Sequence, residues 1–120
     1  MFPQALLAKL FVKGSLKNNV NGFEFKIKNI IDTGTIIEVG SIRINEVDFP
    51  ANVCFFQVDG KVVRGDEISN SNPLVARAFR DILINIEGQS LGVGTYKIGL
   101  QIVTREVGKL SFSVSENIHV

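Results

Sequence analysis

The stretch YKIGLQIVTREVGKLSFSVS, residues 96–115, decides the fold because apolar and polar residues alternate along it. Apolar residues occupy the even positions from Tyr96 to Ile102 and again from Leu110 onward, and most odd positions are polar or Gly. Glu106-Val107-Gly108 lies between the two halves and is a turn signal. Alternation with a period of two places one face of each strand on a core and the other in water. The stretch therefore predicts an antiparallel hairpin that covers one side of a core.

Shorter strands precede this hairpin. Residues 23–27 and 82–86 alternate in the same way, and residues 53–58 are apolar at both parities, as in a strand covered on both faces. Asp59-Gly60 predicts a tight turn that joins residues 53–58 to a strand at 61–63. The chain is therefore expected to be rich in antiparallel strands.

Two segments have less regular patterns. Residues 10–16 predict a strand, although lysines at every fourth position here also suit a helix. Residues 34–49 are rich in β-branched side chains, but the parity of the apolar positions slips twice. Because a slip of one residue turns every side chain to the other face, we expect bulges near Gly40 and near Asn45-Glu46.

Residues 64–81 interrupt the strand pattern. Asn72 is a suitable N-cap and Pro73 a suitable first residue for a helix. Apolar residues recur four positions apart between residues 74 and 79, which also favours a helix. We predict one to two helical turns in this crossover, with a plain extended loop as the alternative.

The segment Leu91-Gly92-Val93-Gly94-Thr95-Tyr96 resembles a pattern found before a late strand of immunoglobulin-like modules. In that pattern the tyrosine hydroxyl bonds back to nearby backbone, so Tyr96 is interpreted as structural. We therefore predict an all-β fold: an immunoglobulin-like antiparallel β-sandwich of about seven strands, with one short helical turn in a crossover. Residues 1–120 are expected to form a single domain.

Composition excludes several classes of function. The net charge of +1 gives no reason to expect binding to nucleic acid or to an anionic membrane. The chain has a single cysteine, no apolar run long enough to span a membrane and no signal-peptide pattern at its start. These features predict a cytoplasmic protein. A lysine-rich opening followed by an acidic stretch indicates cross-strand charge pairs or, alternatively, complementary faces for self-association.

Reactive clusters are not apparent in the sequence. His119 and Cys54 are the only residues of their types, which is too few for a zinc site, and a Cys–His pair would need a residue beside the chain end. Cys54 lies in an apolar segment, where a thiol is usually inert packing. We predict no metal site and no cofactor.

Charged side chains concentrate in the irregular segment between the predicted strands. Loops on a rigid scaffold are where binding residues gather, and arginine is favoured at interfaces. The candidate binding residues are Arg64, Asp66, Glu67, Arg77, Arg80 and Asp81.

Three pieces of the chain, Gly22–Ile27, Val58–Lys61 and Leu91–Tyr96, together resemble the small β subunit of C-glycoside deglycosidases. In that family the small subunit is a sandwich that packs on a larger barrel subunit, which carries the metal and most catalytic residues. The resemblance implies an accessory role for this chain and places no catalytic residue in it.

Three functions remain open at this point. The first is a noncatalytic interaction module, either an accessory subunit of a protein partner or a self-assembling homo-oligomer. The second is an enzyme whose Asp/Arg site lies at a subunit interface within residues 64–81. The third is a module that binds a small ligand or carbohydrate, which the absence of Trp disfavours.

Overall fold

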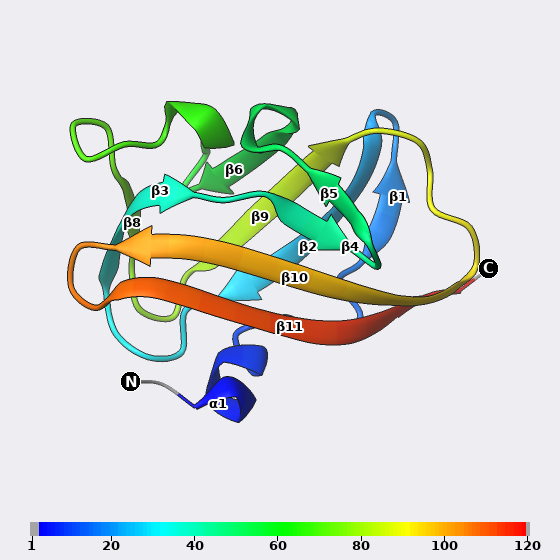
Figure 1. Cartoon of the computed structure of the whole chain (residues 1–120), viewed down its shortest axis with the longest axis horizontal. Helices are drawn as coiled ribbons and strands as arrows, with labels where there is room; N and C mark the ends of the chain where they lie inside the picture. The colour runs from blue at the N-terminus through cyan, green and yellow to red at the C-terminus, as the bar shows by residue number, and fades with distance from the viewer. Residues whose placement is uncertain (1–2, 120) are drawn as a thin grey trace.

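The computed structural model describes residues 3–119, which form two β-sheets packed face to face (Figure 1). The five-stranded sheet contains β1 Lys17–Asn19, β2 Gly22–Lys28, β9 Asp81–Glu87, β6 Cys54–Val58 and β7 Lys61–Arg64, in that spatial order. The six-stranded sheet contains β5 Val47–Phe49, β4 Ile42–Ile44, β10 Gly94–Thr104, β3 Gly34–Val39, β8 Leu74–Ala76 and β11 Gly108–Ile118. Three short helical segments complete the described part: α1 Gln4–Ala8, η1 Ala51–Val53 and η2 Gly65–Glu67.

The strand β10 organises the six-stranded sheet. One of its edges pairs with β11 along the whole strand, from Gly94 opposite Ile118 to Thr104 opposite Gly108. Its other edge pairs with β4 and then with β3, so these two short strands share one side of β10. The strand β5 extends the sheet beyond β4, and β8 extends it beyond β3. The pairings of both sheets are antiparallel.

The core lies between the two sheets, and alternate residues along β2, β9 and β10 are buried in it. In β9, Ile82, Ile84 and Ile86 are buried, while the residues between them are half-buried. Phe25 of β2 is fully buried and stacks on Phe11, with 4.9 Å between ring centroids. Burying each such side chain contributes about 1.5–3 kcal/mol. The alternation in the sequence is therefore the pattern of this core.

The hairpin predicted at residues 96–115 is confirmed. Ile98 lies opposite Val114 and Leu100 opposite Phe112, as expected for strands that share one apolar face. The hydroxyl of Tyr96 donates a hydrogen bond to the Gly92 carbonyl oxygen at 2.8 Å, which confirms the structural role assigned to this tyrosine.

The strand predicted at residues 10–16 is wrong. The helix α1 ends at Ala8, Phe11 forms only an isolated bridge with Ile27, and the first strand begins at Lys17. The apolar side chains of this segment are nevertheless core residues: Leu10, Phe11 and Leu16 are buried. Their apolar pattern reflects burial in the core, and residues of an irregular segment can be buried as well as residues of a strand.

The helix predicted after Asn72 is also wrong. Residues Leu74–Ala76 form the edge strand β8, in which the outer two residues are buried and Val75 is exposed. The Asn72 side chain donates its Nδ2 hydrogen to the Glu67 carbonyl oxygen at 2.8 Å, instead of capping a helix. The apolar residues of this segment therefore follow the two-residue period of a strand and not the four-residue spacing of a helix. Pairing with β3 supplies the backbone hydrogen bonds of β8.

The strand count was underestimated, since residues 3–119 contain eleven strands and about seven were predicted. The segment 34–49 divides into β3, β4 and β5, with a break at Gly40. Asn45, which has a φ of 55°, lies in a hairpin turn between β4 and β5, not in the bulge that was expected there. A strand of three residues is too short to be recognised from alternating apolar and polar residues.

Candidate functional site

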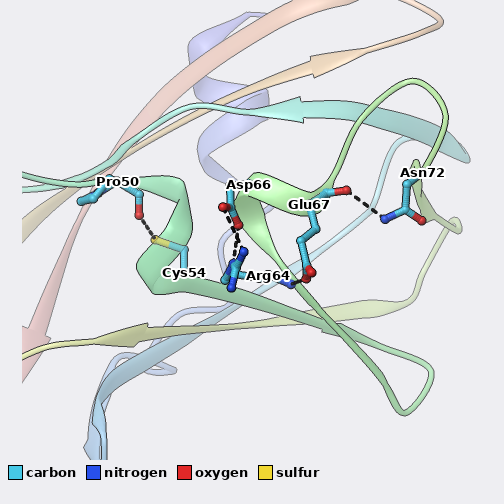
Figure 2. Close-up of polar contacts among 6 residues, drawn as sticks. All are labelled: Pro50, Cys54, Arg64, Asp66, Glu67 and Asn72. Carbon is cyan, nitrogen blue, oxygen red and sulfur yellow. Dashed lines mark hydrogen bonds and ion pairs between the residues drawn. The ribbon is translucent and has the colours of Figure 1, made fainter.

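Three of the six predicted binding residues lie together around η2 (Figure 2). Arg64 donates hydrogen bonds to the Asp66 carboxylate through Nε and Nη2, the second at 3.2 Å to Oδ2. This hydrogen-bonded pairing holds the pKa of Asp66 below its ordinary value and raises that of Arg64. The Glu67 carboxylate accepts the backbone N–H of Arg64 at 3.2 Å. These charges are thus occupied in closing a local turn.

The other three residues lie elsewhere on the surface. Arg80 reaches Asp59 of the β6–β7 turn, with 3.6 Å between Nη1 and Oδ1. Asp81 begins β9 opposite Lys28 of β2, and Arg77 is exposed in the turn before it. None of the six lines the hollow on the outer face of the six-stranded sheet or the hollow between the two sheets. Binding by these six residues stays a prediction.

Cys54 occupies a different environment from these charges. Figure 2 shows its thiol beside Pro50, whose carbonyl oxygen accepts a hydrogen bond from Sγ at 3.5 Å. The residue is fully buried, and burial raises the pKa of the Cys54 thiol to about 12. A thiol with this pKa is protonated at neutral pH and is a poor nucleophile.

Residues 3–119 contain no group of three or more His, Cys, Asp or Glu side chains that could hold a metal ion. Over the same residues, no helix is long and apolar enough to cross a membrane.

A polar hollow of about 560 Å³ lies on the outer face of the six-stranded sheet. Its floor is Gly99 of β10, which has no side chain and lies opposite Arg43 of β4 and Ser113 of β11. Because cross-strand partners point to the same face, Arg43, Gly99 and Ser113 form one row across three strands. The next row contains Gln101 opposite Ser111.

The helix α1 closes one side of this hollow. The Gln4 side chain donates a hydrogen bond from Nε2 to the Ser111 carbonyl oxygen at 2.6 Å. Figure 1 shows α1 beside β11, near the edge of the sheet. The hollow therefore lies between a strand edge and the row of side chains on β4 and β10.

Several polar side chains around the hollow have no hydrogen-bond partner within the described part of the chain. Within residues 3–119, the side chains of Ser41, Gln101, Ser111 and Ser113 form no hydrogen bond, and all four are exposed. Arg43 donates only its Nε to Asp48, at 3.0 Å, which leaves its other donors facing solvent. The arrangement presents hydrogen-bond donors and acceptors to the solvent.

This hollow could not be predicted from the sequence alone, although some of its residues share a recognisable pattern. The serines of β11 and Gly99 of β10 share the polar parity of the hairpin. Their gathering with Arg43 and Asp48 depends on the register of β4 against β10, and alternation within one strand does not determine that register.

Comparison with known proteins corrects one expectation. The chain matches the family model described as the hydroxymethylglutaryl-CoA reductase N-terminal domain, over residues 6–119. A search of curated proteins gave no match. The resemblance to the small β subunit of C-glycoside deglycosidases is therefore wrong. It rested on one strand, one tight hairpin and one sandwich corner, which are common to many β-sandwiches. The chain belongs to the family of hydroxymethylglutaryl-CoA reductase N-terminal domains, which are noncatalytic domains of a larger enzyme.

Proposed function

We propose that this chain is an interaction domain that docks on the catalytic part of a hydroxymethylglutaryl-CoA reductase. The observation that carries the proposal is the polar hollow on the outer face of the six-stranded sheet, with its glycine floor. The family match supplies the choice of partner.

The chemistry of the hollow suits a protein surface. Interfaces between separately folded parts have polar rims and form about one hydrogen bond per 100–200 Å² of buried surface. The exposed serine, glutamine and arginine side chains around Gly99 offer such bonds. A bulky side chain of the partner can enter the space above Gly99, because no side chain of this residue occupies it. Self-assembly through the same face is the competing arrangement.

We further propose that the sandwich is of the immunoglobulin-like kind. The support is the spatial order of the strands: β1-β2-β9-β6 corresponds to the A-B-E-D sheet of that fold, and β3 or β4 with β10 and β11 to the C-F-G sheet. The hydrogen bond from Tyr96 to Gly92 at the start of β10 also fits the tyrosine corner of that fold.

The test is co-purification of affinity-tagged chain from the source cells. We expect a hydroxymethylglutaryl-CoA reductase catalytic polypeptide to be recovered at near-equal stoichiometry, together with hydroxymethylglutaryl-CoA-dependent reductase activity. Recovery of the tagged chain without that polypeptide would contradict the proposal. Recovery of the chain only with untagged copies of itself would assign the surface to self-assembly instead.

A matched pair of variants ties the result to the hollow. Gly99→Phe fills the space above β10, and an added Cβ there has its nearest contact at 3.6 Å, so the variant is expected to fold. Val62→Phe adds similar bulk on β7 of the other sheet, where Val62 is exposed. We expect Gly99→Phe to reduce recovery of the reductase at least tenfold and Val62→Phe to leave it unchanged.

A further inference from the structure

A second hollow opens between the two sheets, separate from the polar one. It has a volume of about 250 Å³ and lies where the β10–β11 turn, the start of β3, β8 and the β2–β3 connection come together. These elements gather at the left end of Figure 1. The β2–β3 connection, residues 29–33, forms part of its wall.

The walls of this hollow, the intersheet cavity, are aliphatic. Ile27 and Ile82 come from the five-stranded sheet, and Ile36, Ala76 and Ile102 come from the six-stranded sheet. Among residues 3–119, no aromatic side chain lines this cavity. A wall of branched aliphatic side chains favours hydrocarbon over a planar or polar guest.

Several polar groups at the rim already have hydrogen-bond partners. Asn29 donates to the carbonyl oxygens of Asp32 and Ala76, and Thr104 donates to the Gly108 carbonyl oxygen. Glu106 accepts two hydrogen bonds from Thr35. Among residues 3–119, no buried side-chain nitrogen or oxygen lacks a hydrogen-bond partner. A ligand inside the cavity would therefore make apolar contacts, because the buried polar side chains already have hydrogen-bond partners.

The mouth sets the character of the guest's head group. Lys28, Asp32 and Glu106 line the rim, so charges of both signs border the mouth. An uncharged head avoids repulsion from either sign and can stay in water at the mouth. A strongly charged head of either sign would meet a like charge.

Volume sets the length of the guest. A dry cavity of about 150 Å³ holds benzene in another protein, so by proportion about 250 Å³ holds roughly ten carbon-sized atoms. We infer that the intersheet cavity binds the hydrocarbon chain of a medium-length aliphatic molecule with an uncharged head, such as a fatty alcohol. This site is independent of the polar hollow, so either can exist without the other.

The experiment is a titration of the full chain with 1-butanol, 1-hexanol and 1-octanol, observed through the NMR signals of isoleucine methyl groups. We expect the methyl groups of Ile27, Ile82 and Ile102 to shift, and the affinity to rise about fourfold for each added methylene. An affinity that does not depend on chain length, or octanol shifts that avoid these methyl groups, would overturn the inference.

Variants that fill the cavity provide the control. Ala76→Leu adds bulk to the wall and is expected to weaken octanol binding at least tenfold, while Val62→Leu on the exposed strand β7 leaves it unchanged. If Ala76→Leu does not fold, Gly34→Val tests the same point, because a Cβ there meets only Glu106 Oε1, at 3.8 Å. Unweakened octanol binding in a folded cavity-filling variant would also overturn the inference.

Discussion

Two residues show how local environment decides chemistry in this domain. Cys54 is the only thiol, and its burial beside Pro50 raises its pKa to about 12, so packing removes its reactivity. Glu106 is exposed, yet both its carboxylate oxygens accept hydrogen bonds from Thr35, each at 2.8 Å. These bonds hold the pKa of Glu106 below its ordinary value of 4.5.

The lowered pKa of Glu106 makes the stability of the domain dependent on pH in the acidic range. A carboxylate whose pKa is lower in the folded state stabilises that state above its unfolded pKa, and this contribution is lost as pH falls through the folded pKa. We expect Glu106→Gln to lower the midpoint of urea unfolding at about pH 7 and to have a smaller effect at about pH 2. Glu38→Gln, at an exposed carboxylate on neighbouring β3, is the control and should change neither midpoint. Equal effects of Glu106→Gln at both pH values would refute this account.

At the scale of elements, two glycines in strands have opposite roles. A Cβ on Gly22 of β2 would overlap the Ile86 carbonyl oxygen of β9, whereas a Cβ on Gly99 would have its nearest contact at 3.6 Å. We expect Gly22→Ala to cost about 2 kcal/mol or more, because the backbone of two paired strands must separate. Gly99→Ala should cost less than about 1 kcal/mol. Thermal and urea unfolding of the two variants measure the difference, and equal losses would show that the strand packing around Gly22 is misjudged.

The sequence predicted well those strands that have one buried face and one solvent-exposed face. In β10 and β11 the polar parity is marked by Lys, Gln and Ser, so alternation identified both strands and the turn between them. The segment 10–16 misled because its apolar residues are buried without forming a strand. The segment 73–80 misled because its apolar residues suited spacings of two and four alike, and pairing with β3 decided between them. Local pattern cannot supply that tertiary partner.

The candidate site was even harder to predict from local sequence patterns. The sequence identified charged residues in the irregular segment, but the structure uses Arg64, Asp66 and Glu67 to close a turn. The row of Arg43, Gly99 and Ser113 joins residues far apart in the chain, and only the registers of β4, β10 and β11 bring them together. A site built from cross-strand neighbours becomes visible once those registers are known.

At the scale of the whole molecule, the surface of the two sheets has regions of different chemical character. The outer face of the six-stranded sheet carries the polar hollow, the intersheet cavity opens at one end, and the residues around η2 form a self-contained turn. The domains of the matched family belong to a larger enzyme. The central claim is that the polar hollow is the face that meets the rest of that enzyme.

The most direct test is the rate of maleimide labelling at an introduced cysteine, with and without saturating reductase catalytic polypeptide. The buried Cys54 should stay unlabelled in the folded chain, so Ser113→Cys and Val62→Cys each report on one exposed position. The account predicts that the catalytic polypeptide slows labelling of the Ser113→Cys variant at least tenfold and leaves the Val62→Cys variant unchanged. Equal labelling of the Ser113→Cys variant with and without the catalytic polypeptide would contradict it.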